Sequence, residues 1–233
     1  MKTFSRWVED QENRKKIFVL VGPPSVGKST WIANTFQNEP YVINRDDIVN
    51  QIAKGMRMTY DDMFMSPPSS AKIGDFDSKY GQVVASPSFM TWQPLSYENI
   101  KNANDTINQL LKEKFSNAVS SGMDIVVDMT NMTARARQSA LEAIKGHESD
   151  YHKVAVVFPF RGAEQIIKKV SAMRAEKEKQ MGGSKTIPEA AFDRMFSSFQ
   201  EVSPNEGFDE IIQYDNRELL NRLAQGLDKQ EVV

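Results

Sequence analysis

The sequence predicts an α/β fold in which helices flank a mainly parallel sheet. Three observations support this prediction. Short apolar runs alternate with segments of helical periodicity, a glycine-rich loop joins the first run to the first helix, and acidic residues follow two of the runs. The chain has 233 residues, of which 40% are apolar and 26% charged. This length and composition fit a single globular domain with an irregular insertion.

The first part of the chain contains two predicted strands and one predicted helix. A polar N-terminal extension, 1–15, has the apolar spacing of a short helix. Residues 17–21 are apolar at every position, as expected for a central parallel strand that is buried on both faces. Residues 29–36 are then expected to form a helix, and 41–43 a second short strand.

The stretch at about 55–96 is predicted to be an irregular insertion. It is rich in Met, Ser, Pro and Gly, and more than forty residues without periodicity are too many for a simple connection. One interpretation is a disordered or poorly packed insertion. The other, which we favour because disordered segments are usually poor in aromatic residues, is a substrate-binding lobe. The aromatic residues concerned are Phe64, Phe76, Tyr80, Phe89, Trp92 and Tyr97.

Beyond the insertion, helices and strands alternate again. Residues 97–121 place apolar side chains on one helical face, and Gly122 follows where a helix C-terminus favours glycine. The segment Thr186-Ile187-Pro188-Glu189 has the form of a capping box with an early proline. The helix after it presents an apolar stripe. The other predicted elements are strands at 125–128, 154–158 and 208–214 and helices at 135–144 and 163–179.

The glycine-rich loop is the strongest functional signal in the sequence. Gly22, Gly27, Lys28 and Ser29 fully satisfy the P-loop pattern G-x-x-x-x-G-K-[S/T], between a predicted strand and a predicted helix. Such a loop directs backbone N–H groups at phosphate oxygens, while the lysine reaches the β and γ phosphates and the hydroxyl is placed to bind Mg²⁺. The residues expected to bind ATP are Gly22, Pro23, Pro24, Ser25, Val26, Gly27, Lys28, Ser29 and Thr30.

Two acidic residues follow predicted strands and are expected to lie near the nucleotide. Ligands of open α/β sheets bind beyond the carboxyl ends of the strands, and Asp46 and Asp128 follow such ends. Each acid could orient Mg²⁺ or accept a proton from an attacking hydroxyl. Alternatively, Asp46 and Asp47 could simply cap a helix N-terminus, and Asp128 could be a turn residue.

Several segments together resemble the 5′-kinase domain of phage polynucleotide kinases. These are residues 22–31, Ile43-Asn44-Arg45-Asp46-Asp47, Val127-Asp128-Met129-Thr130-Asn131, 185–188 and 207–211. The resemblance covers about 17–50, 97–160 and 165–215. It implies that Asp46 is the general base toward a 5′-hydroxyl, that Asp128 lies in the same site and helps to bind Mg²⁺, and that Arg45 and Asn131 contact the acceptor. It also implies a basic lid over the ATP phosphates.

The sequence departs from that family at two positions of functional importance. Where the phage enzyme has an arginine that holds the phosphate on the 3′ side of the acceptor, this chain has Val49. The lid arginine is also missing, because Gly182 occupies its place. Arg174 is our first candidate to replace it, and three lysines (Lys177, Lys179 and Lys185) are alternatives. A charged, solvated helix face explains most of 168–179 equally well.

These observations lead to three hypotheses about function. The first is an ATP- and Mg²⁺-dependent kinase acting on a hydroxyl of nucleic acid, either a 5′-end or a hydroxymethylated base of phage-type DNA. A flipped base or a stacked single strand would suit the aromatic residues of the insertion. The second is a kinase for a nucleoside, sugar or antibiotic. The third is an NTP-binding regulatory switch or defence module, for which Lys28 would be essential and Asp46 dispensable.

Composition restricts the remaining possibilities. A net charge of −2 gives no overall attraction to nucleic acid, although a local basic groove is compatible with it. The chain has no cysteine, which excludes disulfides, thiolate metal sites and a cysteine nucleophile. Apolar runs are shorter than the ~20 residues that span a bilayer, and the N-terminus lacks a signal-peptide core. We therefore expect a cytoplasmic protein, or a phage-encoded one acting in the host cytoplasm, without a membrane partner.

Overall fold

The computed structural model describes residues 14–55, 60, 81–85, 90–94, 97–180 and 185–225. The chain forms two compact units. The first comprises Met1–Asn44, Lys112–Ala172 and Ile187–Val233, and the second comprises Arg45–Leu111 and Met173–Thr186. The predicted N-terminal helical extension lies largely outside the described residues, as does most of 55–96. The interpretation of the whole chain as one domain with an insertion stays a prediction.

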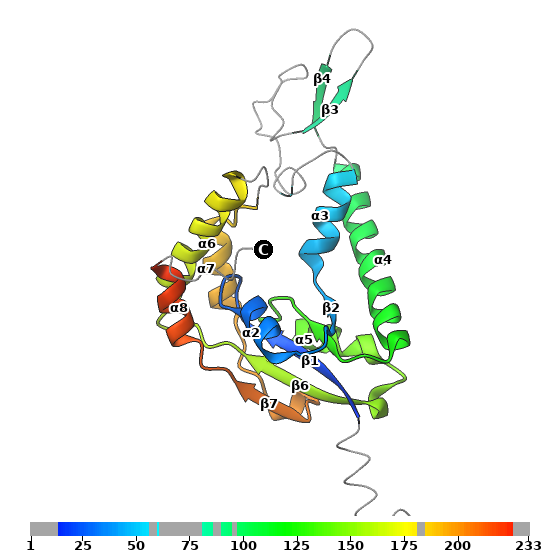
Figure 1. Ribbon diagram of the computed structural model, residues 1–233. Coiled ribbons are helices and arrows are strands. Elements are labelled where there is room, and N and C mark those ends of the chain that lie inside the picture. Colours follow the sequence, from blue (N-terminus) through cyan, green and yellow to red (C-terminus); the bar gives the residue numbers. More distant parts are fainter. Residues whose placement is uncertain are drawn as a thin grey trace, which may run out of the picture. The chain divides into compact units, whose positions relative to one another are not determined.

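The first unit is built on a parallel five-stranded sheet, which confirms the predicted fold class (Figure 1). The strand order is β2-β5-β1-β6-β7, and every neighbouring pair is parallel. The central strand, β1, pairs with β5 on one side and β6 on the other. The strands are β1 (Lys15–Val21), β2 (Tyr41–Ile43), β5 (Ile125–Val127), β6 (Tyr151–Val157) and β7 (Glu210–Gln213).

The central strand is buried on both faces, as its uninterrupted apolar sequence predicts. Ile17 and Val19 point to the opposite face from Leu20, yet all three have no exposed surface. Leu20 belongs to a large core cluster that also contains Trp31 of helix α2 (Lys28–Thr35). The Trp31 ring makes an edge-on contact with Phe158, with ring centroids 6.3 Å apart. Burial of this indole fixes the helix that follows the glycine-rich loop.

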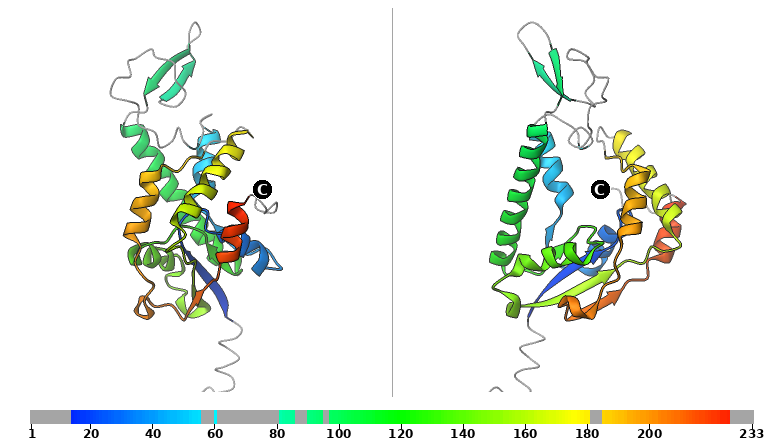
Figure 2. Two further views of the ribbon diagram at one scale, coloured as in Figure 1. Left: turned by 90° about the vertical axis from the view of Figure 1, so that its left-hand side faces the viewer. Right: turned by 180° about the vertical axis from the view of Figure 1, so that it is seen from behind.

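The remaining helices mostly follow the predictions. One of them, α6 (Glu164–Gln180), belongs to the first unit up to Ala172 and to the second unit from Met173. Figure 2 shows α6 and α7 side by side, and Lys168 of α6 joins them by ion pairs to Glu189 (2.9 Å) and Asp193 (2.7 Å) of α7. The apolar stripe of α7 packs on the core, as predicted, with Phe192 buried. The helix bounds are α5 (Ala134–Leu141), α6 (Glu164–Gln180), α7 (Glu189–Ser198) and α8 (Arg217–Ala224), and short 3₁₀ turns lie at Glu142–Ile144, Glu148–Asp150 and Pro204–Glu206.

Two details of these helices differ from the sequence predictions. The helix expected over 135–144 ends at Leu141 and continues as the first 3₁₀ turn. The capping box predicted at Thr186 is wrong, because α7 is preceded by Pro188 and has no side-chain cap. Pro188 lacks an N–H and fixes its own φ, so it starts the helix without help from a hydroxyl. A capping box does form elsewhere, between Ser203 and Glu206.

The second unit contains α3 (Arg45–Gly55), most of α4 (Tyr97–Ser121) and a hairpin of β3 (Gly81–Ala85) and β4 (Met90–Pro94). The hairpin is antiparallel and lies inside the predicted irregular insertion, where no strand was expected. Ile48, Val49 and Ala53 of α3 pack with Ile107 of α4 in a small core of their own. Over the residues described, no helix is long and apolar enough to span a membrane.

Candidate active site

The glycine-rich loop adopts a conformation that suits an anion. Ser25 (φ 62°) and Gly27 (φ 97°) have left-handed backbones, so the loop turns sharply before α2. Gly27 is the N-cap of α2 and offers no side-chain cap, and the first turn carries no acidic residue. The first helical N–H groups are therefore left without a capping side chain, at the positive end of the helix dipole. This is the arrangement that binds phosphate at a helix N-terminus.

Lys28 extends back over the loop that precedes it. Its Nζ donates to the carbonyl oxygens of Gly22 (3.1 Å) and Pro23 (2.9 Å). These bonds keep an ammonium group at the loop, where it can interact with phosphate oxygens. The sequence motif predicts Lys28 at this place for its charge, and the two carbonyl contacts hold it there.

Two hydroxyl groups follow the lysine in the first turn of α2. Ser29 is exposed, which suits a group that shares a metal ion with nucleotide oxygens. The Thr30 Oγ1 atom is buried and has no hydrogen-bond partner among the described residues. Buried hydroxyl groups are normally paired. An unpaired hydroxyl in the first turn of a P-loop helix fits a bound phosphate, and the donors of this loop therefore fit ATP.

The loop is braced from two neighbouring segments of the first unit. Gly22 N–H donates to the carbonyl of Thr130 (2.9 Å), and the Asn216 side chain donates to the carbonyl of Val26 (3.0 Å). Asn216, only 1% exposed, directly precedes α8. Asn216 could not be predicted from the sequence, because a lone asparagine 190 positions from its partner carries no local signal.

We expect Gly27→Ala to weaken ATP binding by roughly 10–100-fold, because an added Cβ displaces loop amides that bond phosphate. The Cβ would lie 2.5 Å from Leu219 Cδ2, on a residue already at φ +97°. Gly162→Ala is the matched control, with φ +84° and nothing within 4 Å of the added Cβ. Both variants should lose about 1–2 kcal/mol of stability from the left-handed backbone. Calorimetric ATP titration checks the difference, and equal ATP affinities would contradict it.

Asp128 lies at the predicted place beyond a strand, close to the start of the glycine-rich loop. Its backbone N–H donates to the Ile43 carbonyl (2.9 Å), and it lies one residue beyond the Val19–Val127 pair of β1 and β5. Asn44 Nδ2 donates to Asp128 Oδ2 (3.3 Å). This contact gives a role to Asn44, which helix capping by Asp46 and Asp47 does not explain.

The described part of the chain has no group of three or more acidic or histidine side chains that could hold a metal ion by themselves. This agrees with the way Mg²⁺ is usually bound beside nucleotides, through one or two protein oxygens and the phosphates. Ser29 and Asp128 have the oxygen chemistry for that role. Their assignment as Mg²⁺ ligands stays a prediction.

Asn131, predicted to contact the acceptor, is buried, and its side chain is hydrogen-bonded to the backbone. It is 2% exposed, has a left-handed backbone (φ 46°), and its Nδ2 donates to the carbonyl of Leu20 (2.8 Å). Its own carbonyl accepts a bond from Arg137 (3.1 Å), which is fully buried. Arg137 also forms a bidentate ion pair with Glu206 (2.6 and 2.8 Å). These contacts point to a structural role for the Asn131 amide, between the β1 end and the Asp128 turn.

We expect Arg137→Met to lower the free energy of unfolding by about 1.5–3 kcal/mol at neutral pH, because the half-buried, charged carboxylate of Glu206 loses its hydrogen bonds to the guanidinium. The Arg137 hydrogen bond holds the pKa of Glu206 below its ordinary value of 4.5. A carboxylate with a lowered folded-state pKa stabilises the protein above that ordinary value, and this stability is lost as the pH falls through the folded-state pKa. The difference between wild type and variant should therefore shrink below about pH 4.5, as urea unfolding can check. A constant difference across pH 3–7 would contradict the mechanism.

Asp46, the predicted general base, lies in the second unit. It is in the first turn of α3, which begins at the half-buried Arg45. Lys185 Nζ contacts its Oδ2 at 2.5 Å, and the Tyr60 hydroxyl donates to its Oδ1 at 2.7 Å. Asp47, the other acid of that turn, is exposed. Helix capping alone explains Asp47, whereas Asp46 is part of a cluster that capping does not explain.

Two further predicted positions can be placed in the second unit. Val49 is completely buried in the small α3–α4 core, so its side chain is not available to an acceptor. Arg174, our first lid candidate, is half-buried on α6. Lys185, one of the alternatives, makes the ion pair with Asp46.

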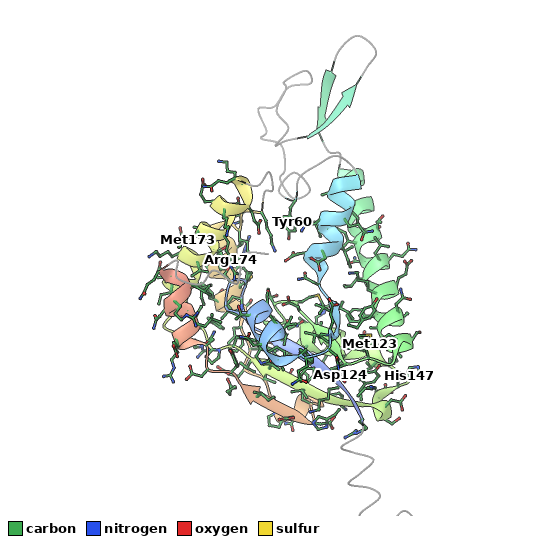
Figure 3. All side chains as sticks on the ribbon, viewed as in Figure 1. Tyr60, Met123, Asp124, His147, Met173 and Arg174 are labelled. Carbon is green, nitrogen blue, oxygen red and sulfur yellow. The ribbon has the colours of Figure 1, made fainter. Side chains whose placement is uncertain are left out.

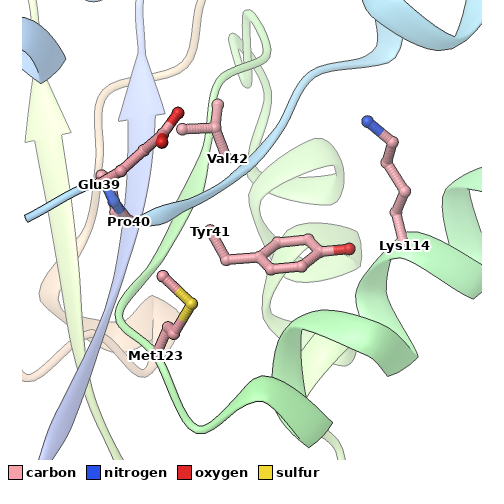
Figure 4. Close-up of a pocket in the computed structure, with 6 residues that line it drawn as sticks. All are labelled: Glu39, Pro40, Tyr41, Val42, Lys114 and Met123. Atoms are coloured by element: carbon pink, nitrogen blue, oxygen red, sulfur yellow. The ribbon is translucent and has the colours of Figure 1, made fainter.

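A shallow hollow occurs in the first unit, but at the wrong end of the sheet for nucleotide binding (Figure 4). Tyr41 and Ile125 form the first pair of β2 and β5, so the hollow lies at the amino ends of these strands. Ligands of such sheets bind at the carboxyl ends. The hollow is lined by Glu39, Pro40, Tyr41, Val42, Lys114 and Met123.

Comparison with known proteins places the chain in a family. The family AAA_33, described as AAA domain, matches residues 17–202. No curated protein matches the sequence. One similar solved structure is "a putative kinase" from Chloroflexus aurantiacus, with a TM-score of 0.51 and 10% identity over 93% of this chain and 100% of that one. A fungal RNA kinase reaches a TM-score of 0.34 at 12% identity, over 91% and 82%. The first likeness concerns the fold alone, and the second is too low to support an argument.

Proposed function

The chain belongs to the AAA domain family AAA_33, and from that premise we propose that it is an ATP-dependent kinase that transfers the γ-phosphate to a hydroxyl on nucleic acid. The observation that carries the proposal is the setting of Asp46. It follows β2, lies in the first turn of a helix, and its side chain is 38% exposed while engaged by Tyr60 and Lys185. An accessible, oriented carboxylate is what a general base toward a hydroxyl requires.

In this proposal the two acids have different roles. The loop amides and Lys28 hold the ATP phosphates. Ser29 and Asp128 would hold Mg²⁺, which would neutralise charge on the phosphates. Asp46 accepts the proton of the acceptor hydroxyl. The acceptor oxygen forms a bond to the γ-phosphorus as the bond to the bridging oxygen breaks, and ADP leaves. Arg174 or Lys185 supplies positive charge to the phosphoryl group in transfer.

We favour nucleic acid as the acceptor because the chain resembles polynucleotide kinases. Two of the segments that carry this resemblance also contact each other in the fold. Asn44 of the Ile43–Asp47 segment donates to Asp128 of the Val127–Asn131 segment. A polynucleotide 5′-hydroxyl is the default acceptor, and a hydroxymethylated base is the alternative on the same polymer.

A small-molecule kinase is the second candidate, and burial of Val49 favours it. In phage polynucleotide kinases the corresponding arginine holds the phosphate next to the acceptor hydroxyl. Here the side chain is fully buried in an apolar core and offers no charge. An acceptor without a neighbouring phosphate, such as a nucleoside or sugar, would not need that contact.

The decisive assay offers γ-labelled ATP with a panel of acceptors: 5′-hydroxyl DNA and RNA, hydroxymethylated DNA, and nucleosides. Label on a polymer supports the first candidate, and label on nucleosides alone supports the second. ATP hydrolysis that no acceptor changes, with the label only in inorganic phosphate and in none of the acceptors, would reject both and favour a switch. Asp46→Asn in each reaction shows whether the labelled product depends on the proposed base.

A further inference from the structure

Both carboxylate oxygens of Asp46 are engaged within the second unit, by residues from two other segments. The Tyr60 hydroxyl donates to Oδ1 at 2.7 Å, and Lys185 Nζ contacts Oδ2 at 2.5 Å. Lys185 Nζ also lies 5.3 Å from the centre of the Tyr60 ring. Figure 3 labels Tyr60, which was absent from the aromatic residues singled out in the sequence.

These contacts are more specific than an ordinary surface ion pair. Tyr60 is 14 residues from Asp46 and Lys185 is 139 residues away, so local helix chemistry does not bring the three together. The side chains of Lys185 and Asp46 are only 27% and 38% exposed. A short hydrogen bond to an ionised carboxylate is among the stronger kinds in proteins. The lysine over the ring adds a cation–π contact to the same cluster.

We propose that Tyr60 is a positioning residue for Asp46: its hydroxyl holds Oδ1, so that Oδ2 is the oxygen that receives the proton of the acceptor hydroxyl. This inference rests on the proposed kinase function. Lys185 covers Oδ2 in the structure described, and the acceptor hydroxyl replaces it there. Tyr60 is thereby added to the residues predicted from sequence.

The chemistry of the two partners assigns these different roles. A tyrosine hydroxyl stays protonated near neutral pH, so it remains a donor to Oδ1 throughout the reaction. Its bond fixes the plane of the carboxylate, which a general base needs in order to lie within about 2.6–3.2 Å of the acceptor hydroxyl. The lysine has a flexible four-carbon stem and is a mobile point charge. It can leave Oδ2, and once displaced it is a cation close to the reacting hydroxyl.

The test compares three single variants in the labelled-ATP assay. Tyr60→Phe removes only the hydroxyl and keeps the ring beside Lys185. It should lower kcat about 10–100-fold, the effect of losing one hydrogen bond to a charged group, with ATP affinity unchanged. Lys185→Met should instead lower the acceptor KM, because it removes the competitor for Oδ2, and it lowers kcat where Lys185 rather than Arg174 supplies charge to the phosphoryl group. Tyr41→Phe, in the hollow at the amino end of β2, is the matched hydroxyl control and should behave as wild type.

The pH profile separates positioning from a purely structural effect. A hydrogen bond to a carboxylate favours its ionised form. The acid limb of kcat/KM should therefore move to higher pH in Tyr60→Phe and stay in place in Tyr41→Phe. A Tyr60→Phe enzyme with an unchanged profile, or with a changed KM and an unchanged kcat, would overturn the inference while leaving the kinase proposal intact. Thermal unfolding of each variant verifies that it is folded.

A failure of the kinase proposal can be distinguished from a failure of this inference. If the wild-type protein labels no acceptor, the proposed function fails, and the Tyr60 contact is tested without turnover. The ¹³C NMR signal of the labelled Asp46 carboxylate, assigned by its absence in Asp46→Asn, is titrated in wild type and in Tyr60→Phe. A midpoint at higher pH in Tyr60→Phe supports the contact, and identical midpoints overturn it.

Discussion

Asparagine in place of Asp46 is expected to lower phosphoryl transfer by about 10²–10⁴-fold, the usual contribution of a general base. The side chain keeps its size, and its oxygen can still accept the Tyr60 hydroxyl at Oδ1. What it loses is the ability to take a proton from the acceptor, together with the ion pair to Lys185. ATP binding should not change, because the ATP-binding residues lie in the glycine-rich loop. Single-turnover transfer and calorimetric ATP titration measure the two quantities separately.

Asp47→Asn is the matched control for this substitution. Asp47 is the next residue in the same first turn of α3, is exposed, and loses the same unit of charge on replacement. It should retain nearly the wild-type rate. Equal losses in both variants would show that the turn needs negative charge rather than a base. Undiminished transfer in Asp46→Asn would remove Asp46 from the mechanism.

Lys28→Ala is expected to weaken both ATP binding and transfer, with transfer falling by about 10²–10³-fold, as when one preorganised donor to the transition state is removed. The lysine Nζ is held at the loop by the carbonyls of Gly22 and Pro23. Without it, these carbonyls lose their donor and the phosphates lose a cation. The binding and transfer measurements used for Asp46→Asn distinguish the two variants.

Lys145→Ala controls for the loss of one lysine, since Lys145 is exposed after the 3₁₀ turn at Glu142–Ile144. It should leave both quantities unchanged. The Lys28 and Asp46 variants together also separate a kinase from a nucleotide switch. A switch requires Lys28 and tolerates Asp46→Asn, whereas a kinase requires both. ATP turnover that survives Lys28→Ala at the wild-type rate would contradict both interpretations.

The parts of the fold that were predictable from sequence are those with a strong local signal. Residues 17–21 predicted a central strand because both of its faces are apolar, and β1 is buried on both faces. The phosphate loop is identifiable because its residues are consecutive. The apolar stripe of α7 was predictable because the helical spacing of apolar residues indicates which side of the helix faces the core. Each of these signals lies within a single segment.

The parts that could not be predicted depend on contacts between distant segments. Asn131 looked like a substrate ligand, but its amide bonds the carbonyl of Leu20, 111 residues away. Tyr60 and Lys185 both contact Asp46 because the fold of the second unit brings the three residues together. Their spacing in the sequence does not predict this cluster. The β3–β4 hairpin was not predicted because each strand has only five residues and β3 does not alternate apolar and polar residues. The expected capping box failed for a local reason, since Pro188 took the N-cap position.

Burial of Val49 has a consequence for protein engineering. Grafting an arginine there, to give this chain the acceptor-phosphate contact of phage polynucleotide kinases, would place a guanidinium among Ile48, Ala53 and Ile107. An unpaired charge in such surroundings disrupts packing before it can reach a ligand. Acceptor choice is therefore not transferable by a single exchange at this position. Redesign would have to start from residues that already point outward.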